Sequence, residues 1–396
     1  MIDRQCAGLL PDKPHTVFRA PDGRILHEEM VTRRGFEGAF TYLYHRSPVG
    51  GHSEVSASTR GWRPPHPDPE AHRPLRRRLY LSDRLPAGGM LVDRRVPILF
   101  NDDVTVLLAQ PTQTDDVYFA NGDGDELWFV QEGSGRIESP CGWLDARAGD
   151  YVWIPKAMVH RWHVGEPLRL LAFETRGGVR VPAAYRNAVG QLRMDAPYTH
   201  RDFVRPRGPI ATMERAEEGP CELLVKKAGA FTRYALEHPP MDVVGWDGFV
   251  YPFAFPIERF APKTGLVHLP PSVHATFDGP GFVVCSFVPR MLDTHPQAIP
   301  CPYPHSSVDC DEVILYLRGN FTSRRGVGPG AISLHPSGIA HGPHPGAYEA
   351  SIGTRSTEEL AVMCDTLSPL TPTAQATNIE DNGYHETWRE NLPRQP

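Results

Sequence analysis

The chain has 396 residues and a formal net charge of −6. This acidic balance excludes a protein whose main partner is nucleic acid, because that role needs clustered positive charge. No apolar run reaches the length of a membrane span, so we expect no membrane partner. The 41 prolines and 36 glycines favour a turn-rich, mainly all-β fold over a helical one.

Seven cysteines are scattered along the chain, and none stands in a Cys-x-x-Cys pair. An odd number without zinc-type spacing argues against a disulfide framework and against a structural zinc site. The first residues, MIDRQCAGLLPDKP, lack the features of a signal peptide. We therefore expect a cytoplasmic protein.

Residues 1–95 are expected to form a β-rich N-terminal extension that packs on the unit following it. Within it, residues 50–74 are rich in Pro, His and Ser, and this composition predicts an irregular excursion. Its three histidines, His52, His66 and His72, do not have the spacing of metal ligands.

Residues 96–180 contain a carboxylate and a histidine at spacings that recur later in the chain. Glu126 lies seven positions before Gly133, and Gly149, Pro155 and His160 follow in a G-x5-P-x4-H pattern. The preceding stretch, DDVYFANGDGDE, contains no histidine. One carboxylate and one imidazole do not make a tight metal site. We therefore predict a structural unit here.

Three further segments complete the expected organisation. Residues 181–235 are expected to be a linker region with a short helix and, at ELLVKKAGAFTRYAL (222–236), a hairpin. Residues 236–375 form the expected second β unit. Residues 376–396 form a polar tail, whose GYHETW cluster predicts that it docks on the body of the protein.

The stretch between residues 301 and 349 carries the densest pattern of chemistry-bearing residues. His305 lies seven positions before Glu312, and His341 follows two apolar runs. The run VILYL after Glu312 predicts a buried strand, and AISL before His335 predicts another. Two hairpin-like units can therefore bring His305, Glu312 and His341 to one point. Two imidazoles and one carboxylate are the ligand set of mononuclear non-haem Fe(II) oxygenases.

The same spacing resembles the two motifs of the cupin superfamily. The first motif, G-x5-H-x-H-x3-4-E-x6-G, lacks its leading glycine here, and its second histidine slot holds Ser307. Its other positions, and all positions of the second motif, G-x5-P-x-G-x2-H, are met by His305, Glu312, Gly319, Gly330, Pro336, Gly338 and His341.

The two halves of the chain repeat this pattern at a nearly constant offset. Glu126 and Glu312 lie 186 residues apart, and His160 and His341 lie 181 residues apart. Such an offset indicates an internal duplication. We predict a bicupin, with two double-stranded β-helix (jelly-roll) barrels: a degenerate one at residues 96–180 and a catalytic one at residues 236–375.

The chain resembles the homogentisate 1,2-dioxygenase family over most of its length. The resemblance is strongest at VVGWDGFVYPF, SVHATFD, PYPHSSVDCDEVILYLRGNF, SLHPSGIAHGP and GYHETW. It implies a Fe(II)-dependent ring-cleaving dioxygenase that inserts O2 into a hydroquinone-type aromatic acid in tyrosine and phenylalanine degradation. It also implies that His305, Glu312 and His341 bind the iron.

The resemblance further implies roles for residues around the iron. The catalytic acid/base histidine falls on His274, and substrate-binding positions fall on His335 and Tyr303. Two departures lie close to the expected substrate: Ser307 stands where the family usually has Asn, and Phe321 where it usually has Tyr. These changes leave the identity of the aromatic substrate open.

Several questions stay open at this level. Arg46 is the nearest counterpart of an N-terminal arginine that helps the family bind the substrate carboxylate. Gentisate or another dihydroxy aromatic is an alternative substrate. A Zn- or Mn-dependent cupin isomerase and a non-enzymatic small-molecule-binding bicupin are alternative functions, because fold alone does not decide function. The resemblance implies a homo-oligomer.

Overall fold

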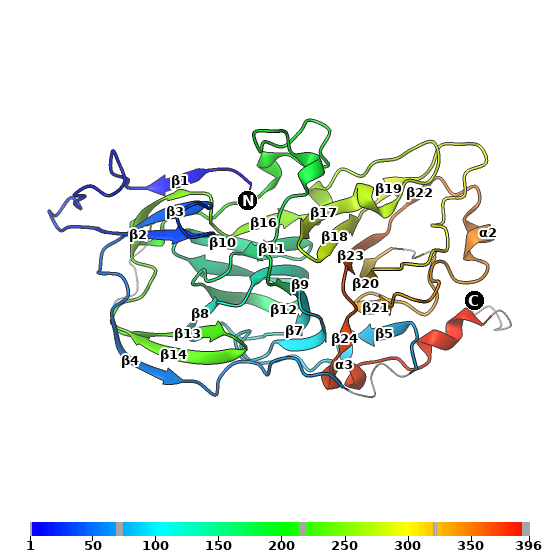
Figure 1. The fold of residues 1–396 in the computed structure, drawn as a ribbon, viewed down its shortest axis with the longest axis horizontal. Helices are drawn as coiled ribbons and strands as arrows, with labels where there is room; N and C mark the ends of the chain where they lie inside the picture. Colours follow the sequence, from blue (N-terminus) through cyan, green and yellow to red (C-terminus); the bar gives the residue numbers. More distant parts are fainter. Residues whose placement is uncertain (1, 69–73, 214–218, 320, 322, 390–396) are drawn as a thin grey trace.

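The computed structural model describes residues 2–68, 74–213, 219–319, 321 and 323–389. These residues fold mainly into β-strands, which form two assemblies lying side by side along the long axis (Figure 1). The predicted all-β bicupin fold is confirmed. Within the described part of the chain, no helix is long and apolar enough to cross a membrane.

The first assembly is built around an eight-stranded sheet with a four-stranded sheet on either side (Figure 1). The large sheet runs in the order β16 (Phe253–Pro256), β11 (Asp150–Ile154), β9 (Asp125–Ser139), β12 (Arg161–Thr175), β7 (Val104–Ala109), β6 (Val96–Phe100) and β24 (Thr371–Pro372), with β10 (Gly142–Arg147) paired to β9. One small sheet contains β1 (Gln5–Gly8), β15 (Val243–Gly248), β3 (Phe40–His45) and β2 (His27–Thr32). The other contains β4 (His52–Ala57), β14 (Ala230–Leu236), β13 (Cys221–Lys227) and β8 (Tyr118–Asn121).

The second assembly is a six-stranded sheet with a two-stranded ladder beside it. The six strands run in the order β17 (Ala275–Gly279), β18 (Phe282–Phe287), β23 (Leu360–Thr366), β20 (Asp311–Arg318), β21 (Ala331–His335) and β5 (Arg78–Leu81). The ladder pairs β19 (Arg290–Met291) with β22 (Ser356–Thr357).

The helices in the described residues are short and connect or cover strands. They are α1 (Ile210–Met213), α2 (Ala347–Ser351), α3 (Ala374–Asn378) and the 3-10 turns η1 (Ser82–Arg84), η2 (Ala183–Tyr185), η3 (His200–Asp202), η4 (Ile257–Arg259), η5 (Pro271–His274) and η6 (Tyr384–Trp388). The turn η6 contains the aromatic cluster of the tail, and its Tyr384 is buried against the second assembly.

Three strands tie the assemblies together across the sequence. Strand β5, from the expected N-terminal extension, pairs with β21 of the second sheet. Strand β16 follows the expected linker yet pairs with β11, and β24 near the C-terminus pairs with β6. The five-part division of the sequence stays a prediction, and the strand exchange shows that its parts share their sheets.

Two local expectations can be compared directly with the structure. The hairpin expected at 222–236 is confirmed as β13 and β14. The irregular excursion expected at 50–74 is wrong for residues 52–57, which form the edge strand β4 against β14. The alternating polar and small residues of HSEVSA suit a solvent-facing edge strand, and the Pro-rich composition further along masked this pattern. His72 lies outside the described residues.

The alternating side chains of β20 determine which face of the second sheet carries Glu312. Val313 and Leu315 pack into the main hydrophobic core between the assemblies. Ile314 and Tyr316 pack into a separate cluster on the opposite face. Because successive side chains of a strand point to opposite faces, Glu312 lies on the face of Ile314 and Tyr316. This face is directed away from the first assembly.

Candidate metal centre

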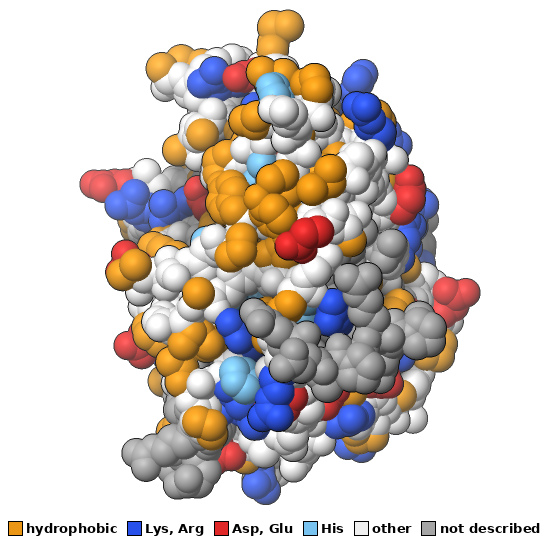
Figure 2. Space-filling model, turned by 90° about the vertical axis from the view of Figure 1, so that its right-hand side faces the viewer, with side chains coloured by type: hydrophobic (Ala, Val, Ile, Leu, Met, Phe, Trp, Pro, Cys, Tyr) orange, Lys and Arg blue, Asp and Glu red, His pale blue; other side chains and the backbone are white. Residues whose placement is uncertain are grey.

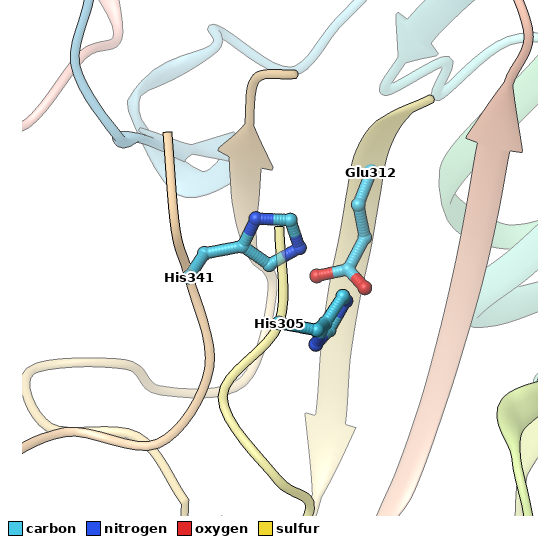
Figure 3. A group of neighbouring side chains, drawn as sticks. All are labelled: His305, Glu312 and His341. Atoms are coloured by element: carbon cyan, nitrogen blue, oxygen red, sulfur yellow. The ribbon is translucent and has the colours of Figure 1, made fainter. Parts of the chain in front are cut away.

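Three potential metal ligands meet at the mouth of the second sheet. Glu312 is the second residue of β20, while His305 and His341 come from two loops beside it (Figure 3). The backbone amides and carbonyls of His305 and His341 exchange two hydrogen bonds of 2.8 Å. One ligand atom from each of the three side chains lies within 4.8 Å of the other two. The structure therefore brings together the three residues that the spacing had grouped.

The orientation of the two imidazoles leaves one nitrogen of each free for a ligand. The Nδ1 atom of His305 lies 3.3 Å from the carbonyl oxygen of Tyr303, and that of His341 lies 3.4 Å from the carbonyl of Ile339. A ring that donates Nδ1–H to a backbone carbonyl presents an unprotonated Nε2, as metal-binding histidines do. The Nε2 atom of His341 is buried and has no hydrogen-bond partner. A buried orphan nitrogen of this kind fits a metal site.

The carboxylate of Glu312 is held by a histidine directly across the β ladder. His335 is the partner of Glu312 in the β20–β21 register, and its Nδ1 lies 2.6 Å from Glu312 Oε1. The guanidinium of Arg324 lies 3.9 Å from the same oxygen. Burial alone would raise the pKa of Glu312, but the His335 hydrogen bond and the Arg324 charge lower it to about 2. Glu312 is therefore an anion, and its Oε2 is available for a metal.

His335 itself is a neutral donor to this carboxylate. Burial lowers the pKa of His335 to about 4, although the hydrogen bond with Glu312 acts in the opposite direction. A neutral ring that donates through Nδ1 orients the carboxylate in the way that outer partners orient metal ligands.

His274, the expected acid/base residue, lines the same cavity as His305 and Glu312. It ends the turn η5, its side chain is buried, and its Nδ1 has no hydrogen-bond partner. Burial, together with the positive charge of Arg290, lowers the pKa of His274 to about 3. The imidazole is therefore neutral at pH 7 and can accept a hydrogen bond or a proton.

The cavity encloses about 90 Å³ between the sheet and its covering loops. Its walls combine His305, Glu312 and His274 with the apolar side chains of Phe287 and Ile314. Two cations, Arg290 and Arg324, also line it. An apolar cavity with a few convergent polar groups is typical of a small-molecule site.

The expected substrate-binding residues are placed differently from one another. His335 contacts Glu312, as described above. Tyr303 is half-exposed, and its ring packs edge-on against His268, which lines the cavity. Phe321 is buried and packs on the ring of Tyr316, another lining residue. The backbone carbonyl of Ser307 accepts a hydrogen bond from Gly338.

Tyr303, Ser307 and Phe321 do not belong to the described residues that line this cavity. Arg46 lies elsewhere, beside a different depression next to Leu9 and Val244. Its Nη2 donates to the carbonyl of Ala211 at 2.8 Å. The nearest sequence counterpart of a carboxylate-binding arginine is therefore not at the triad.

Sequence reasoning missed the two arginines that do line the cavity. Arg324 lies in the connection between β20 and β21, and Arg290 lies in β19. Arg290 Nη2 lies 3.4 Å from Glu359 Oε2. Neither arginine stands at a motif position, so the only available signal was their closeness in sequence to the ligand segments.

The corresponding position of the first assembly is filled by an ion pair. The guanidinium of Arg95 pairs with Glu126, and both side chains are 1% exposed. Glu126 also accepts hydrogen bonds from Asn121 and Trp128 at 2.9 and 2.8 Å. The Nε2 atom of His160 stands 4.0 Å from Glu126 Oε2. Arg95 thus neutralises the Glu126 carboxylate inside the first assembly.

Comparisons with known proteins relate this chain to dioxygenases. Residues 103–257 match the family model described as "Homogentisate 1,2-dioxygenase N-terminal". A protein of Saccharolobus solfataricus, named "Putative dioxygenase", is 35% identical over 388 residues, which cover 96% of this chain and 97% of that relative. The homogentisate 1,2-dioxygenase of Bradyrhizobium diazoefficiens is 29% identical over 292 residues, covering 69% of this chain and 63% of that enzyme.

Among solved structures, a cupin 2 conserved barrel domain protein from Leptotrichia buccalis aligns with 73% of this chain and 96% of its own, at 11% identity and a TM-score of 0.34. The fold and the relatives together define a bicupin of the dioxygenase class. More narrowly, the chain belongs to the homogentisate 1,2-dioxygenase family.

Proposed function

We propose that this protein is a Fe(II)-dependent ring-cleaving dioxygenase, acting on homogentisate or a closely similar hydroquinone-type aromatic acid. The observation that carries the proposal is the triad of His305, Glu312 and His341, with ligand atoms within 4.8 Å of one another. Two imidazoles and one carboxylate suit mononuclear iron and leave open positions for substrate and O2. The relatives support the reaction class, because they are named as dioxygenases.

The residues around this site would have different roles in the reaction. A bound Fe(II) would lower the pKa of a coordinated phenol and activate O2 beside it. His274 accepts the phenolic proton or polarises the oxygen, since it is neutral and its Nδ1 is unpartnered. An anionic substrate near Arg290 would offset the positive charge that helps depress the pKa of His274.

The shape and charge of the cavity support an aromatic acid. Phe287 and Ile314 offer apolar contact to a ring, and Arg290 offers a cation near His274. Burial of the walls excludes water from the reacting atoms, which strengthens the electrostatic interactions inside. Ser307 and Phe321 differ from the family pattern, and Phe321 packs on Tyr316, which lines the cavity, so a different phenol stays an outcome of the test below.

The proposal extends to the setting of the enzyme. We infer a cytoplasmic homo-oligomer that serves the breakdown of tyrosine and phenylalanine. Hydrophobic side chains gather on the face of the second assembly drawn in Figure 2. This assembly exposes the side chains of Leu266, Val267, Met291 and Ile352. Exposed apolar surface of this kind supports association with further copies.

A substrate panel tests the proposal. Oxygen uptake is measured for the Fe(II)-loaded protein with homogentisate, gentisate and unsubstituted hydroquinone. We expect uptake with homogentisate together with a new ultraviolet-absorbing ring-opened product. Uptake with gentisate alone would support the iron site but would identify gentisate, rather than homogentisate, as the substrate. Bound metal without uptake on any of the three compounds would overturn the dioxygenase assignment.

A further inference from the structure

The C-terminal turn η6 places one indole ring beside the metal triad. The ring of Trp388 stacks on the imidazole of His344, with centroids 3.7 Å apart and planes inclined by 28°. The guanidinium of Arg77 lies over Trp388 at 4.6 Å from a ring centroid. Residues from the N-terminal part, the second motif and the tail therefore meet at this indole.

The same indole touches the histidine that holds the carboxylate ligand. The rings of Trp388 and His335 meet edge to face, with centroids 6.2 Å apart and planes at 78°. His335 Nδ1 holds Glu312 Oε1 at 2.6 Å, while its Nε2 is buried without a hydrogen-bond partner. One hydrogen bond and packing therefore fix the imidazole of His335. Trp388 packs against it at a steep angle, and the ring of His341 stacks on it.

Hydrogen bonds anchor the partners of this indole. His344 Nε2 lies 2.7 Å from Thr387 Oγ1, and its Nδ1 accepts from the backbone amide of Arg325 at 3.1 Å. The guanidinium of Arg77 donates to the carbonyl of Ala340, the residue before His341. Movement of η6 would therefore be transmitted to both sides of the triad.

We propose that Trp388 is a positioning residue of the metal centre, which keeps the imidazole of His335, and through it the Glu312 carboxylate, in the orientation for metal binding. This inference rests on the proposed function, because it takes the triad to be a metal site. Loss of the indole opens space beside a ring with a single hydrogen bond. The ring then rotates, and the carboxylate loses its fixed donor.

The test is metal binding, which requires neither O2 nor an aromatic substrate. Co(II) is titrated into the metal-free protein, and both its dissociation constant and its visible absorption spectrum are recorded. Trp388→Ala is compared with Trp388→Phe, which keeps an aromatic face. The matched control is Trp143→Ala in the first assembly, where the indole lies between Arg136 at 3.8 Å and His163 at 4.9 Å. Circular dichroism establishes that each variant is folded.

We expect Trp388→Ala to weaken Co(II) binding by about tenfold and to alter the spectrum, as loss of an outer partner of a metal ligand does. Trp388→Phe restores most of the affinity, and Trp143→Ala leaves it unchanged. Unchanged affinity and spectrum in folded Trp388→Ala would overturn the inference while leaving the iron site in place. A wild-type protein that binds Co(II) but, when loaded with Fe(II), consumes no O2 with any of the three aromatic compounds would overturn the proposed function alone.

Discussion

His305 and His341 exchange two backbone hydrogen bonds of 2.8 Å, so two loops from different motifs are locked together at the point where their imidazoles meet. The ring centroids are 4.3 Å apart. Because main-chain atoms make this link, the loops keep their positions when one of the side chains is removed. Substitutions in the triad therefore report on the metal rather than on folding.

His341→Ala should lose iron and activity together. Two remaining ligands do not hold Fe(II) tightly, so metal content should fall from about one ion per chain to near zero. Metal analysis after gel filtration measures this, and thermal unfolding should show a folded protein. The matched control is His163→Ala, since His163 pairs with Glu138 in the first assembly at 2.8 Å. Full iron content in His341→Ala would contradict the assignment.

His274→Ala should keep the iron and lose rate. The buried imidazole lines the cavity without belonging to the triad. Loss of a general acid/base group lowers kcat by about 10²–10⁴-fold. Steady-state oxygen uptake, with iron content measured on the same sample, separates the two effects. A His274→Ala variant with full iron and unchanged kcat would show that His274 takes no part in the reaction.

Arg95→Met should destabilise the first assembly. It leaves the Glu126 carboxylate buried without its cation, and breaking a buried pair in this way costs about 3 kcal/mol. Urea unfolding measures the loss, and iron content should stay at the wild-type level. The double variant Arg95→Met/Glu126→Gln removes the uncompensated charge and should recover part of the stability. Iron loss in Arg95→Met alone would show that the first assembly contributes to the metal site.

The buried histidine of the N-terminal sheet should make stability depend on pH. Burial would lower the pKa of His45, but its hydrogen bonds with Asp242 and Glu29 raise it to about 9. The folded state then holds a proton that the unfolded state releases near its ordinary pKa of about 6.5. The contribution is complete below about pH 6.5 and is lost as the pH rises through 9.

Unfolding free energy measured between pH 6 and 9.5 should therefore fall by up to about 3 kcal/mol from this group. In His45→Gln the fall should be smaller by the same amount. An identical pH profile in the two proteins would show that His45 is not the titrating group.

The all-β bicupin fold and the grouping of the triad could be predicted because both leave local signals. The apolar run VILYL after Glu312 predicts a buried strand, and the glycines at fixed offsets stand next to the strand ends. Gly319 and Gly330 have φ values of +100° and +80°, which other residues rarely adopt. A spacing pattern therefore carried geometric information about residues close in sequence.

Contacts between distant segments left no such signal. The pairing of β5 with β21 joins residues near 80 to residues near 332. The meeting of Arg77, His344 and Trp388 likewise joins three far-separated segments. The ion pair of Arg95 with Glu126 joins residues 31 positions apart in the sequence. Periodicity and motif spacing describe neighbours along a strand or turn, so these relationships require the folded structure.

The most direct test of the central claim is the stoichiometry of oxygen consumption with homogentisate, measured for the metal-free protein, the Fe(II)-loaded protein and Fe(II)-treated His341→Ala. We predict one O2 consumed for each ring opened by the Fe(II)-loaded protein, and none by the other two. Equal turnover by the metal-free protein would contradict a metal centre at His305, Glu312 and His341.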